Sequence, residues 1–309
     1  MTARTRPVRV RNPLAPLTDL SGRRAVVTGG YSGIGLAVTR FLAERGASVV
    51  IGVRDPQRGE HVRAELTAAT GIPSARIEVQ RLDLMDFDSV AEFAEARSAP
   101  LDLLILNAGA SGGVWRTDRN GIESQFATNH LGHFALTGHL LPALARGNDP
   151  RVVTVSSVLY RSASLELDRL TDPRAYSAGR AYNRSKLANA VFAVDLGRRL
   201  AGSGSPVRSF AAHPGMARTP MHATYPSPVV RTVTQALATA IGREPEPAAV
   251  AVLAAALSPA VTPDRFWGPA GSRTDPDAMG VEFATKATDR ASGDQLWAFS
   301  SDATGVRYL

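Results

Sequence analysis

A tyrosine and a lysine lie four residues apart in the stretch AYNRSKLANAVF, as Tyr182 and Lys186. On one helix these two side chains would share a face, with Cβ atoms about 6 Å apart. A phenol with a pKa of about 10 is a poor base at neutral pH, but a nearby ammonium stabilises the phenolate and lowers that pKa. The pair therefore indicates general acid–base chemistry carried by Tyr182.

The use of lysine at this position supports the same interpretation. Of the 35 basic side chains (Lys plus Arg), only Lys186 and Lys286 are lysines. Lysine offers a compact ammonium with three donors on a flexible stem, whereas arginine presents a wide planar fork. The Y-x-x-x-K spacing also occurs by chance, so its meaning depends on the elements that would position the pair.

Those elements follow an alternating pattern from about Arg23 onward, where short β-branched apolar runs are separated by amphipathic helical stretches. This alternation predicts an α/β protein with a single doubly wound Rossmann domain and a parallel sheet of six or seven strands. We expect left-handed glycines to end two of the helices, at Gly46 and Gly202. The predicted strands span residues 25–29, 48–53, 77–83, 101–109, 151–157 and 207–215.

Two irregular segments interrupt the alternation, at 158–180 and 216–247. Ligands of such sheets bind at the carboxyl ends of the strands, so both segments are predicted to be walls of a substrate site. The domain is expected to span 21–309, with the tail 262–309 packed back on its body. A basic arm, 1–20, precedes it.

Composition limits the class of protein. An apolar fraction of 44% and a charged fraction of 20% are ordinary for a soluble globular protein. The chain has no cysteine, which excludes disulfides, thiolate metal sites and cysteine nucleophiles. No apolar run approaches the roughly 18 residues of a membrane span, and no secretion signal is seen, so we expect a cytoplasmic protein.

The net charge of +7 includes four arginines in the arm: Arg4, Arg6, Arg9 and Arg11. No aromatic platform or recognition-helix pattern accompanies them, so a nucleic-acid partner is not expected. The sequence instead predicts a solvated, partly disordered arm, with the remaining charge scattered over the domain.

A glycine-rich segment, TGGYSGIG, follows the first predicted strand and precedes a helical pattern. Its glycines permit a tight turn and let the backbone approach a diphosphate at the positive N-terminus of the next helix. The segment therefore predicts a dinucleotide cofactor, while the role of the additional Gly30 stays open. The residues predicted to line the cofactor here are Gly29, Tyr31, Ser32, Gly33, Ile34 and Gly35.

The end of the second strand bears on which dinucleotide is bound. NAD-binding versions of this motif place an acidic side chain there for the ribose hydroxyls, but this chain has Val53 followed by Arg54. A guanidinium can pair with a 2′-phosphate, so we expect NADP in preference to NAD. The alternative is that Arg54 only closes a surface turn with Asp55.

The spacing G-x-x-x-G-x-G, with Thr-Gly at its head, resembles the glycine motif of the short-chain dehydrogenase/reductase superfamily. Further motifs follow in that family's order between about residues 23 and 260: RLDL, LNAG, TNHLGHFALT, VSS, YNRSKLANAVF and AAHPGMARTPM. The longer strings are most similar to retinol dehydrogenase-like and related bacterial members. Besides Tyr182 and Lys186, the resemblance implies cofactor contacts at Asp83, Leu84, Asn107, Ala108, Gly109, Pro214, Gly215 and Thr219.

The resemblance also implies an activity, the transfer of a hydride between the nicotinamide and a carbonyl or alcohol carbon. Tyr182 would act as general acid or base, and Lys186 would tune it and hold the ribose. Ser157 would polarise the substrate oxygen, and Asn129 would hold a water in the proton relay. The neighbouring Ser156 should point to the other side of the strand and be structural.

Two other classes of function stay open. A non-catalytic NADP-binding regulator could share this fold, although it would need none of the Tyr, Lys and Ser side chains that are present. A lyase or epimerase fits the glycine spacing less well. His130 and His133 are three residues apart, but no carboxylate accompanies them at metal spacing, so we expect packing histidines and no metal.

Ser157 and Tyr182 are 25 residues apart, about twice the separation in many family members. The intervening segment resembles the longer one of retinol dehydrogenase-like members and should shape the substrate pocket or an interface, which leaves monomer and homo-oligomer both open. We expect an apolar substrate with a carbonyl or alcohol group, and the sequence does not identify the substrate further. The residues that suggest an apolar pocket are Leu159, Tyr160, Met216, Met221, Tyr225 and Val229.

Overall fold

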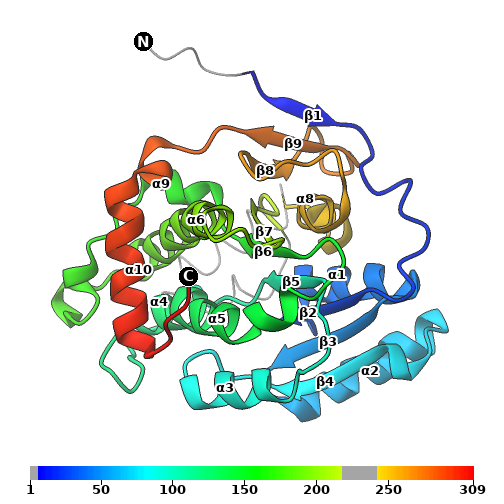
Figure 1. Ribbon diagram of the computed structural model, residues 1–309, viewed down its shortest axis with the longest axis horizontal. Helices are drawn as coiled ribbons and strands as arrows, with labels where there is room; N and C mark the ends of the chain where they lie inside the picture. The colour runs from blue at the N-terminus through cyan, green and yellow to red at the C-terminus, as the bar shows by residue number, and fades with distance from the viewer. Residues whose placement is uncertain (1–5, 218–241) are drawn as a thin grey trace.

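The computed structural model describes residues 6–217 and 242–309. Within these ranges nine strands form one sheet in the order β1-β9-β8-β7-β6-β5-β2-β3-β4 (Figure 1). Strands β2 to β8 pair with one another in parallel. Strand β9 pairs with β8 in antiparallel orientation, and β1 pairs with β9 in the same way at the edge of the sheet. The predicted doubly wound α/β fold is confirmed, but the antiparallel extension was not predicted.

The strands and helices alternate along the chain as the sequence pattern indicates. The strands are β1 (Val8–Val10), β2 (Arg24–Thr28), β3 (Ser48–Val53), β4 (Ile77–Arg81), β5 (Leu103–Leu106), β6 (Arg151–Val155), β7 (Arg208–Ala212), β8 (Phe266–Pro269) and β9 (Ala278–Val281). The long helices are α1 (Gly33–Glu44), α2 (Pro56–Thr70), α3 (Phe87–Glu95), α5 (Gly132–Leu144), α6 (Ala178–Gly202), α8 (Pro245–Leu257) and α10 (Arg290–Thr304). Shorter helical turns are η1 (Ser74–Arg76), α4 (Ser124–Phe126), η2 (Ala127–Leu131), η3 (Val158–Ser162), η4 (Leu167–Arg169), η5 (Pro173–Ala175) and α9 (Thr285–Thr288).

All six predicted strands are present, as β2 to β7. Two expectations about where a helix or an irregular segment ends were wrong. Gly202 is the last residue of α6, and the left-handed glycine is Gly204, around which the Ser205 N–H reaches back to the Leu200 carbonyl at 3.0 Å. The predicted wall 216–247 is also too long, because Pro245 already begins α8. At the end of α1, Gly46 has the predicted positive φ, +92°.

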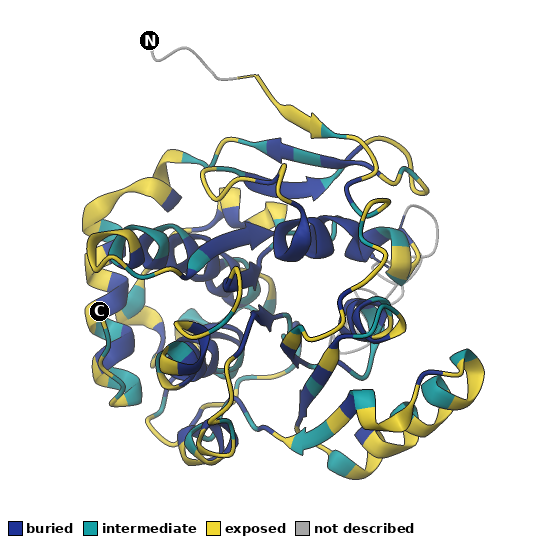
Figure 2. Ribbon diagram, turned by 45° about the vertical axis from the view of Figure 1, so that its right-hand side comes forward, coloured by how far each residue is buried: buried dark blue, intermediate teal, exposed yellow. Residues whose placement is uncertain are grey.

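Helices cover both faces of the sheet (Figure 2), and the sheet separates two hydrophobic cores. One core lies under α1, α2 and α8, and the other lies under α3, α5, α6 and α10. In the second core the Trp297 ring of α10 lies 5.1 Å from Phe134 and 6.0 Å from Phe192, measured between ring centroids. The tail therefore packs against the body, as predicted.

The described part of the N-terminal arm is held against the domain, which the expectation of a solvated arm did not include. Residues 8–10 form β1, which lies beside β9 at the edge of the sheet (Figure 1). Arg9 pairs with Asp275 at 2.8 Å and with Asp277 at 2.7 Å, and the Asn12 N–H donates to Asp277 at 2.8 Å. Backbone pairing and opposite charges thus hold an arm whose basic composition alone favoured solvation.

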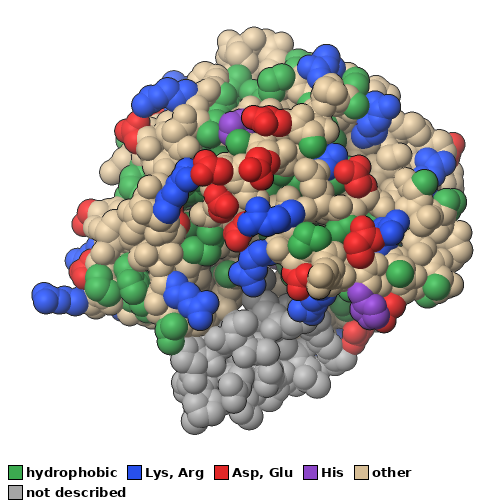
Figure 3. Space-filling view, turned by 90° about the horizontal axis from the view of Figure 1, so that it is seen from below, with side chains coloured by type: hydrophobic (Ala, Val, Ile, Leu, Met, Phe, Trp, Pro, Cys, Tyr) green, Lys and Arg blue, Asp and Glu red, His purple; other side chains and the backbone are tan. Residues whose placement is uncertain are grey.

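Basic and acidic side chains are interspersed on the face of the molecule in Figure 3, as the scattered charge of the sequence predicted. Within the described ranges, no helix is both long enough and apolar enough to pass through a bilayer.

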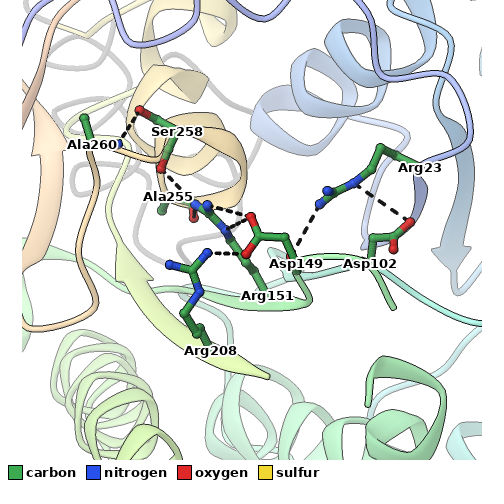
Figure 4. Close-up of polar contacts among 8 residues, drawn as sticks. All are labelled: Arg23, Asp102, Asp149, Arg151, Arg208, Ala255, Ser258 and Ala260. Atoms are coloured by element: carbon green, nitrogen blue, oxygen red, sulfur yellow. Dashed lines mark hydrogen bonds and ion pairs between the residues drawn. The ribbon is translucent and has the colours of Figure 1, made fainter. Parts of the chain in front are cut away.

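An ionic network ties together the amino ends of the strands (Figure 4). Arg151, the first residue of β6, is 1% exposed and contacts Asp149 at 2.8 Å. Its other amino group donates to the carbonyls of Ala255 at 3.2 Å and Ser258 at 3.0 Å. Arg208, the first residue of β7, pairs with the same Asp149 carboxylate. The charge buried at this end of the sheet is therefore compensated.

A second carboxylate extends this network toward β2. Asp102 accepts hydrogen bonds from the backbone N–H groups of Arg24 at 2.7 Å and Asn148 at 2.6 Å. The Arg23 guanidinium lies 3.9 Å from the same carboxylate. Two aspartates thus join the starts of β2, β5, β6 and β7. They fix the amino end of these strands, opposite the carboxyl end where the site is predicted.

Candidate active site

The glycine loop that follows β2 has the close approaches that a dinucleotide cradle needs. Gly29 and Gly33 have positive φ angles of +66° and +50°. A Cβ atom on Gly35 would lie 2.3 Å from the Gly29 carbonyl oxygen, so no side chain fits there. Ser32 precedes α1 without making a side-chain capping bond, which leaves the first N–H groups of that helix open to an anion.

Gly30, whose role the sequence pattern left open, is required by packing against the sheet and α1. A Cβ atom at this position would lie 2.5 Å from Cγ2 of Ile51 and 2.7 Å from Oγ1 of Thr39. Both distances are far below van der Waals contact. The extra glycine therefore lets the loop lie flat on β3.

Arg54 is the first residue after β3 and is exposed, next to the buried Val53. The Asp55 carboxylate caps α2 by accepting from the Arg58 N–H at 3.1 Å, and among the described residues it is not paired with Arg54. The Arg58 guanidinium lies 5.5 Å from the ring centroid of Tyr31, in the glycine loop. The Arg58 guanidinium thus lies beside the glycine loop, and Arg54 follows the strand that pairs with β2.

The segment predicted to hold the adenine is fixed by local hydrogen bonds after β4. The Asp83 carboxylate accepts from the Met85 N–H at 3.0 Å, and the Asp83 N–H donates to the Ser89 hydroxyl at 3.1 Å. Leu84 is buried, and a Cβ atom on Gly132 would lie 2.2 Å from its carbonyl oxygen. This segment therefore lies directly against the start of α5.

The turn Asn107–Ala110, which follows β5, is held at both ends. At its start the Thr28 hydroxyl accepts from the N–H groups of Asn107 and Ala108, both at 2.9 Å. At its end the side-chain oxygen of Asn129 accepts from the Ala110 N–H at 2.6 Å, and its amide group donates to the Ala110 carbonyl at 2.9 Å. The geometry of the turn is thus set by two side chains from distant elements.

Asn129 lies in η2, a π-helical turn that precedes α5. Besides Ala110, its amide group donates to the Ser185 hydroxyl of α6 at 2.9 Å. Both amide hydrogens are therefore used inside the protein, and the oxygens of Asn129 are the groups that could accept from a relay water. Sequence reasoning did not identify Ser185, because nothing in the local pattern distinguishes it from other serines of α6.

Lys186 is buried and lies beside the same turn. A Cβ atom on Gly109 would lie 3.5 Å from its Nζ and 3.3 Å from Oδ1 of Asn129. Nζ donates to the Val155 carbonyl at 3.1 Å and lies 5.6 Å from the ring centroid of Tyr182. Burial lowers the pKa of Lys186 to about 8. Its remaining donors could bind ribose hydroxyls.

Tyr182 and Lys186 share one helix, α6, as their spacing predicted, and Tyr182 is half-buried. At the end of β6 the two serines differ. The Ser156 hydroxyl donates to the Lys186 carbonyl at 2.7 Å and is buried, which confirms its structural role. The Ser157 hydroxyl accepts from the Leu159 N–H at 3.3 Å and is partly exposed at the carboxyl end of the strand.

The turn after β7 contains the residues predicted to approach the nicotinamide. Gly215 has φ +72°, and its N–H donates to Nδ1 of His213 at 3.1 Å. Pro214 lies between these two residues and is partly buried. Thr219 is outside the described residues, as are Met221, Tyr225 and Val229 of the predicted substrate wall.

The predicted apolar pocket is partly corrected. Leu159 and Met216 are exposed, but Tyr160 is fully buried and accepts from the Ala284 N–H at 2.8 Å, so its ring belongs to the core. Two residues that sequence reasoning did not select, Val114 and Val158, are exposed in the segments after β5 and β6. Exposed apolar side chains thus lie in the segments that follow β5, β6 and β7.

The two histidines have separate protein partners, in line with packing roles. His130 lies 2.8 Å from the Ser300 hydroxyl of α10 and is in edge contact with the rings of Phe126 and Phe192. His133 lies between Thr28 and Asn129.

The described residues that the sequence predicted to bind the cofactor or transfer the proton lie in the glycine loop, in the turns after β4, β5, β6 and β7, and on η2 and α6. They are thus found at the carboxyl end of the parallel strands.

The fold is a doubly wound α/β domain with a glycine-rich loop after strand β2, and comparison with known proteins gives the family. The family model for short chain dehydrogenases matches residues 23–229. Human retinol dehydrogenase 12 is 34% identical over 302 residues, which cover 94% of this chain and 89% of that protein. The chain belongs to the short-chain dehydrogenase family.

Other matches differ in extent. Bovine retinol dehydrogenase 12 is 40% identical over 204 residues, so this match spans 65% of the chain and 63% of that relative. A crystal structure of an uncharacterised protein from Mycobacterium paratuberculosis is 35% identical, with a TM-score of 0.75 over 98% of this chain and all of that one (100%). The RhlG/NADP active-site complex from Pseudomonas aeruginosa is 28% identical, with a TM-score of 0.60 over 78% of this chain and 91% of that one.

Proposed function

We propose that this protein is an NADP-dependent oxidoreductase that interconverts a carbonyl and an alcohol, with residues 21–309 as its single domain. The observation that carries the proposal is the buried Lys186, whose Nζ lies 5.6 Å from the Tyr182 ring and beside the Asn107–Ala110 turn. Among the described residues no carboxylate pairs with this ammonium, so its burial costs stability, as is typical of a functional charge.

The residues present fit a dinucleotide. The glycine loop excludes side chains where a diphosphate would approach, and the uncapped start of α1 favours an anion. The Asn107–Gly109 and Pro214–Gly215 turns would line the nicotinamide end, and Asp83 with Leu84 would line the adenine. When bound, the cofactor supplies or accepts the hydride.

The proton chemistry belongs to the protein. Tyr182 gives a proton to the substrate oxygen, or takes one from it, and the Lys186 ammonium favours the phenolate form that this exchange requires. The Ser157 hydroxyl donates a hydrogen bond to the same oxygen. Asn129 connects Lys186 to a relay water through its oxygens.

Three observations support the finer assignments. The exposed Arg54 and the stacked Arg58 provide positive charge for a 2′-phosphate, and the related Pseudomonas aeruginosa structure is an NADP complex. Exposed apolar side chains, including Leu159 and Met216, favour an apolar substrate. Several relatives are named retinol dehydrogenases, which agrees with a substrate of this kind.

Replacement of Tyr182 tests the proposed function. Tyr182→Phe should retain NADPH affinity within about twofold, yet lose carbonyl reduction by about 10²–10⁴-fold, because only the transferred proton is removed. The assay is NADPH absorbance with a panel of apolar ketones and aldehydes. Near-normal turnover by the variant would remove Tyr182 from the acid–base role, and NADPH binding without turnover by the wild type would favour the non-catalytic regulator instead.

Replacement of Arg54 tests the choice of cofactor. Arg54→Asp should raise the KM for NADPH by about 10–100-fold and change that for NADH much less, because a carboxylate repels the 2′-phosphate and can accept from ribose hydroxyls. Arg58→Gln is a matched variant beside the glycine loop, for which we expect a smaller increase in the KM for NADPH. Equal effects on the two cofactors would remove Arg54 from the phosphate site.

A further inference from the structure

His133 connects two elements that both hold the Asn107–Ala110 turn. Its ring is 1% exposed. Its Nε2 lies 2.9 Å from the Thr28 hydroxyl, at the end of β2, and its Nδ1 lies 3.0 Å from the Asn129 carbonyl oxygen, in η2. Thr28 and Asn129 are the side chains that hold the start and the end of the turn.

The partners of His133 determine its tautomer. A carbonyl oxygen can only accept, so Nδ1 must carry the hydrogen that it donates to Asn129. Nε2 is then the acceptor, and the Thr28 hydroxyl donates to it at 2.9 Å in preference to the more distant Ile105 carbonyl at 3.4 Å. Burial, reinforced by the nearby Lys186 ammonium and opposed by the hydrogen bond to Asn129, lowers the pKa of His133 to about 3. The ring is therefore neutral throughout the physiological range.

His130, one turn away, has different partners. Its Nε2 lies 2.8 Å from the Ser300 hydroxyl of α10. This bond braces α10 and has no contact with the Asn107–Ala110 turn. His130 is thus a natural control for His133, since the two rings are equally buried but have different partners.

The local backbone explains why a side chain is needed at Asn129. In η2 the turn is one residue wider than in an α-helix, and the Gly132 N–H donates to the Ala127 carbonyl, five residues before it. Widened turns disturb the regular pattern of backbone bonds. The His133 ring supplies the Asn129 carbonyl with a donor from four residues further on. It thereby fixes the peptide plane from which the Asn129 side chain extends.

We propose that His133 is a positioning residue for the active site, which joins Thr28 to Asn129 so that the Asn107–Ala110 turn is held at one distance from Lys186. This role rests on the proposed function, because the turn matters to catalysis only if it lines a nicotinamide cofactor. The imidazole acts as a neutral two-ended connector and exchanges no proton with the substrate.

The first test needs no activity. In wild-type protein labelled with ¹⁵N-histidine, one non-titrating ring should show the Nδ1–H tautomer between about pH 5 and 8, and His133→Leu should remove its signals. The signals of the His130 ring should stay in His133→Leu and be lost in His130→Leu. An Nε2–H tautomer at His133, or a midpoint within that pH range, would overturn the connector.

The second test measures positioning. His133→Leu should lower kcat/KM by roughly 10–100-fold and weaken NADPH binding by roughly tenfold, because both bonds to the ring are lost. The amide of His133→Asn can occupy the place of Nδ1 but does not reach Thr28, so it should recover only part of the loss. The matched control, His130→Leu, should lower thermal stability by a similar amount but change kcat/KM by less than about threefold.

Coupling and pH dependence separate positioning from simple destabilisation. The double variant of His133→Leu with Thr28→Val should lose much less than the product of the two single losses, because both changes break the same connection. The pH midpoints of kcat should match those of the wild type. Multiplicative losses, or a missing limb in the pH profile, would overturn the proposal.

The proposed function can fail independently of this role. If the wild type binds NADPH but reduces no carbonyl compound, the activity is wrong, yet the NADPH affinities of the His133 and His130 variants still measure the effect on the turn. Equal affinities for wild type and His133→Leu would then refute positioning.

Discussion

The two ends of strand β6 treat charge in opposite ways. At its amino end, Arg151 is buried with Asp149 and two backbone carbonyls as partners (Figure 4). At its carboxyl end, Lys186 is also buried, but the partner of its ammonium among residues 6–217 and 242–309 is the neutral Val155 carbonyl. A compensated charge fixes the sheet, whereas an uncompensated one destabilises it and is available for a ligand.

The pKa values follow this difference. Burial alone would raise the pKa of Asp149, but hydrogen bonds from Arg208 and Arg151 outweigh burial and lower it. For Lys186 burial is the whole cause, and its pKa falls from 10.5 to about 8. At the amino end the charged form of Asp149 is therefore favoured, although burial lowers the pKa of its partner Arg151, whereas at the carboxyl end the charged form of Lys186 is disfavoured with no carboxylate favoured in return.

Removal of the lysine charge should have the largest effect and should separate activity from stability. Lys186→Met is expected to lower kcat by about 10²–10⁴-fold, because Tyr182 loses the ammonium that favours phenolate. The free energy of unfolding at pH 7 should rise by about 1–3 kcal/mol, since a desolvated charge is replaced by an apolar chain. Steady-state kinetics and urea denaturation measure the two quantities. A loss of both activity and stability in Lys186→Met would contradict the view that the buried ammonium serves function at the expense of stability.

Removal of the arginine at the other end should have the reverse pattern. Arg151→Met is expected to lower the free energy of unfolding by about 2–3 kcal/mol, because the Ala255 and Ser258 carbonyls lose their donor. The loss is moderate because Asp149 is partly solvated and keeps Arg208. Its kcat per folded molecule should stay within about twofold of the wild type. A large fall in kcat would mean that the two ends of β6 are coupled.

The smallest expected effect is a difference in pH dependence. Because the folded pKa of Lys186 is below its unfolded value, the unfolded state binds more protons between about pH 8 and 10.5, and stability should rise with pH there. The slope should not exceed about 1.4 kcal/mol per pH unit. Lys186→Met should lack this rise, which denaturation at several alkaline pH values would measure.

The amino-end network should respond in acid instead. Asp149 has a lowered pKa, so its contribution is present above 3.8, its ordinary value, and is lost as the pH falls through the folded value. The stability difference between wild type and Arg151→Met should therefore shrink in that acid range. A difference that instead changed near pH 9 would assign the wrong group to the network.

Much of the fold was predictable because its signals are local. The alternation of apolar strands and amphipathic helices gave all six of β2 to β7, and the position of Gly46 gave the end of α1. The strand β1 was missed because its three residues are paired only through β9 and the aspartates Asp275 and Asp277, far along the chain. Charge in the sequence cannot reveal which distant partner it will meet.

The predicted site shows the same division. The Tyr182–Lys186 spacing and the glycine loop were visible in the sequence, since helical periodicity and turn geometry depend on a few neighbouring residues. The roles of Gly30 and Ser185 were not visible, because they follow from contacts with β3 and with η2. Tyr160 was assigned to the pocket because an exposed and a buried aromatic look alike in sequence.

By itself, the sequence determined that this chain folds as a doubly wound α/β domain and that a phenol and an ammonium share one helix. Only the tertiary structure decided that Lys186 is buried beside Gly109 with no carboxylate partner among the described residues. It also decided that His133, which bonds to Asn129, reaches Thr28, 105 residues away in the chain. The physical reason is that patterning and turns act over a few residues. Desolvation and buried hydrogen bonds depend on which distant surfaces pack together.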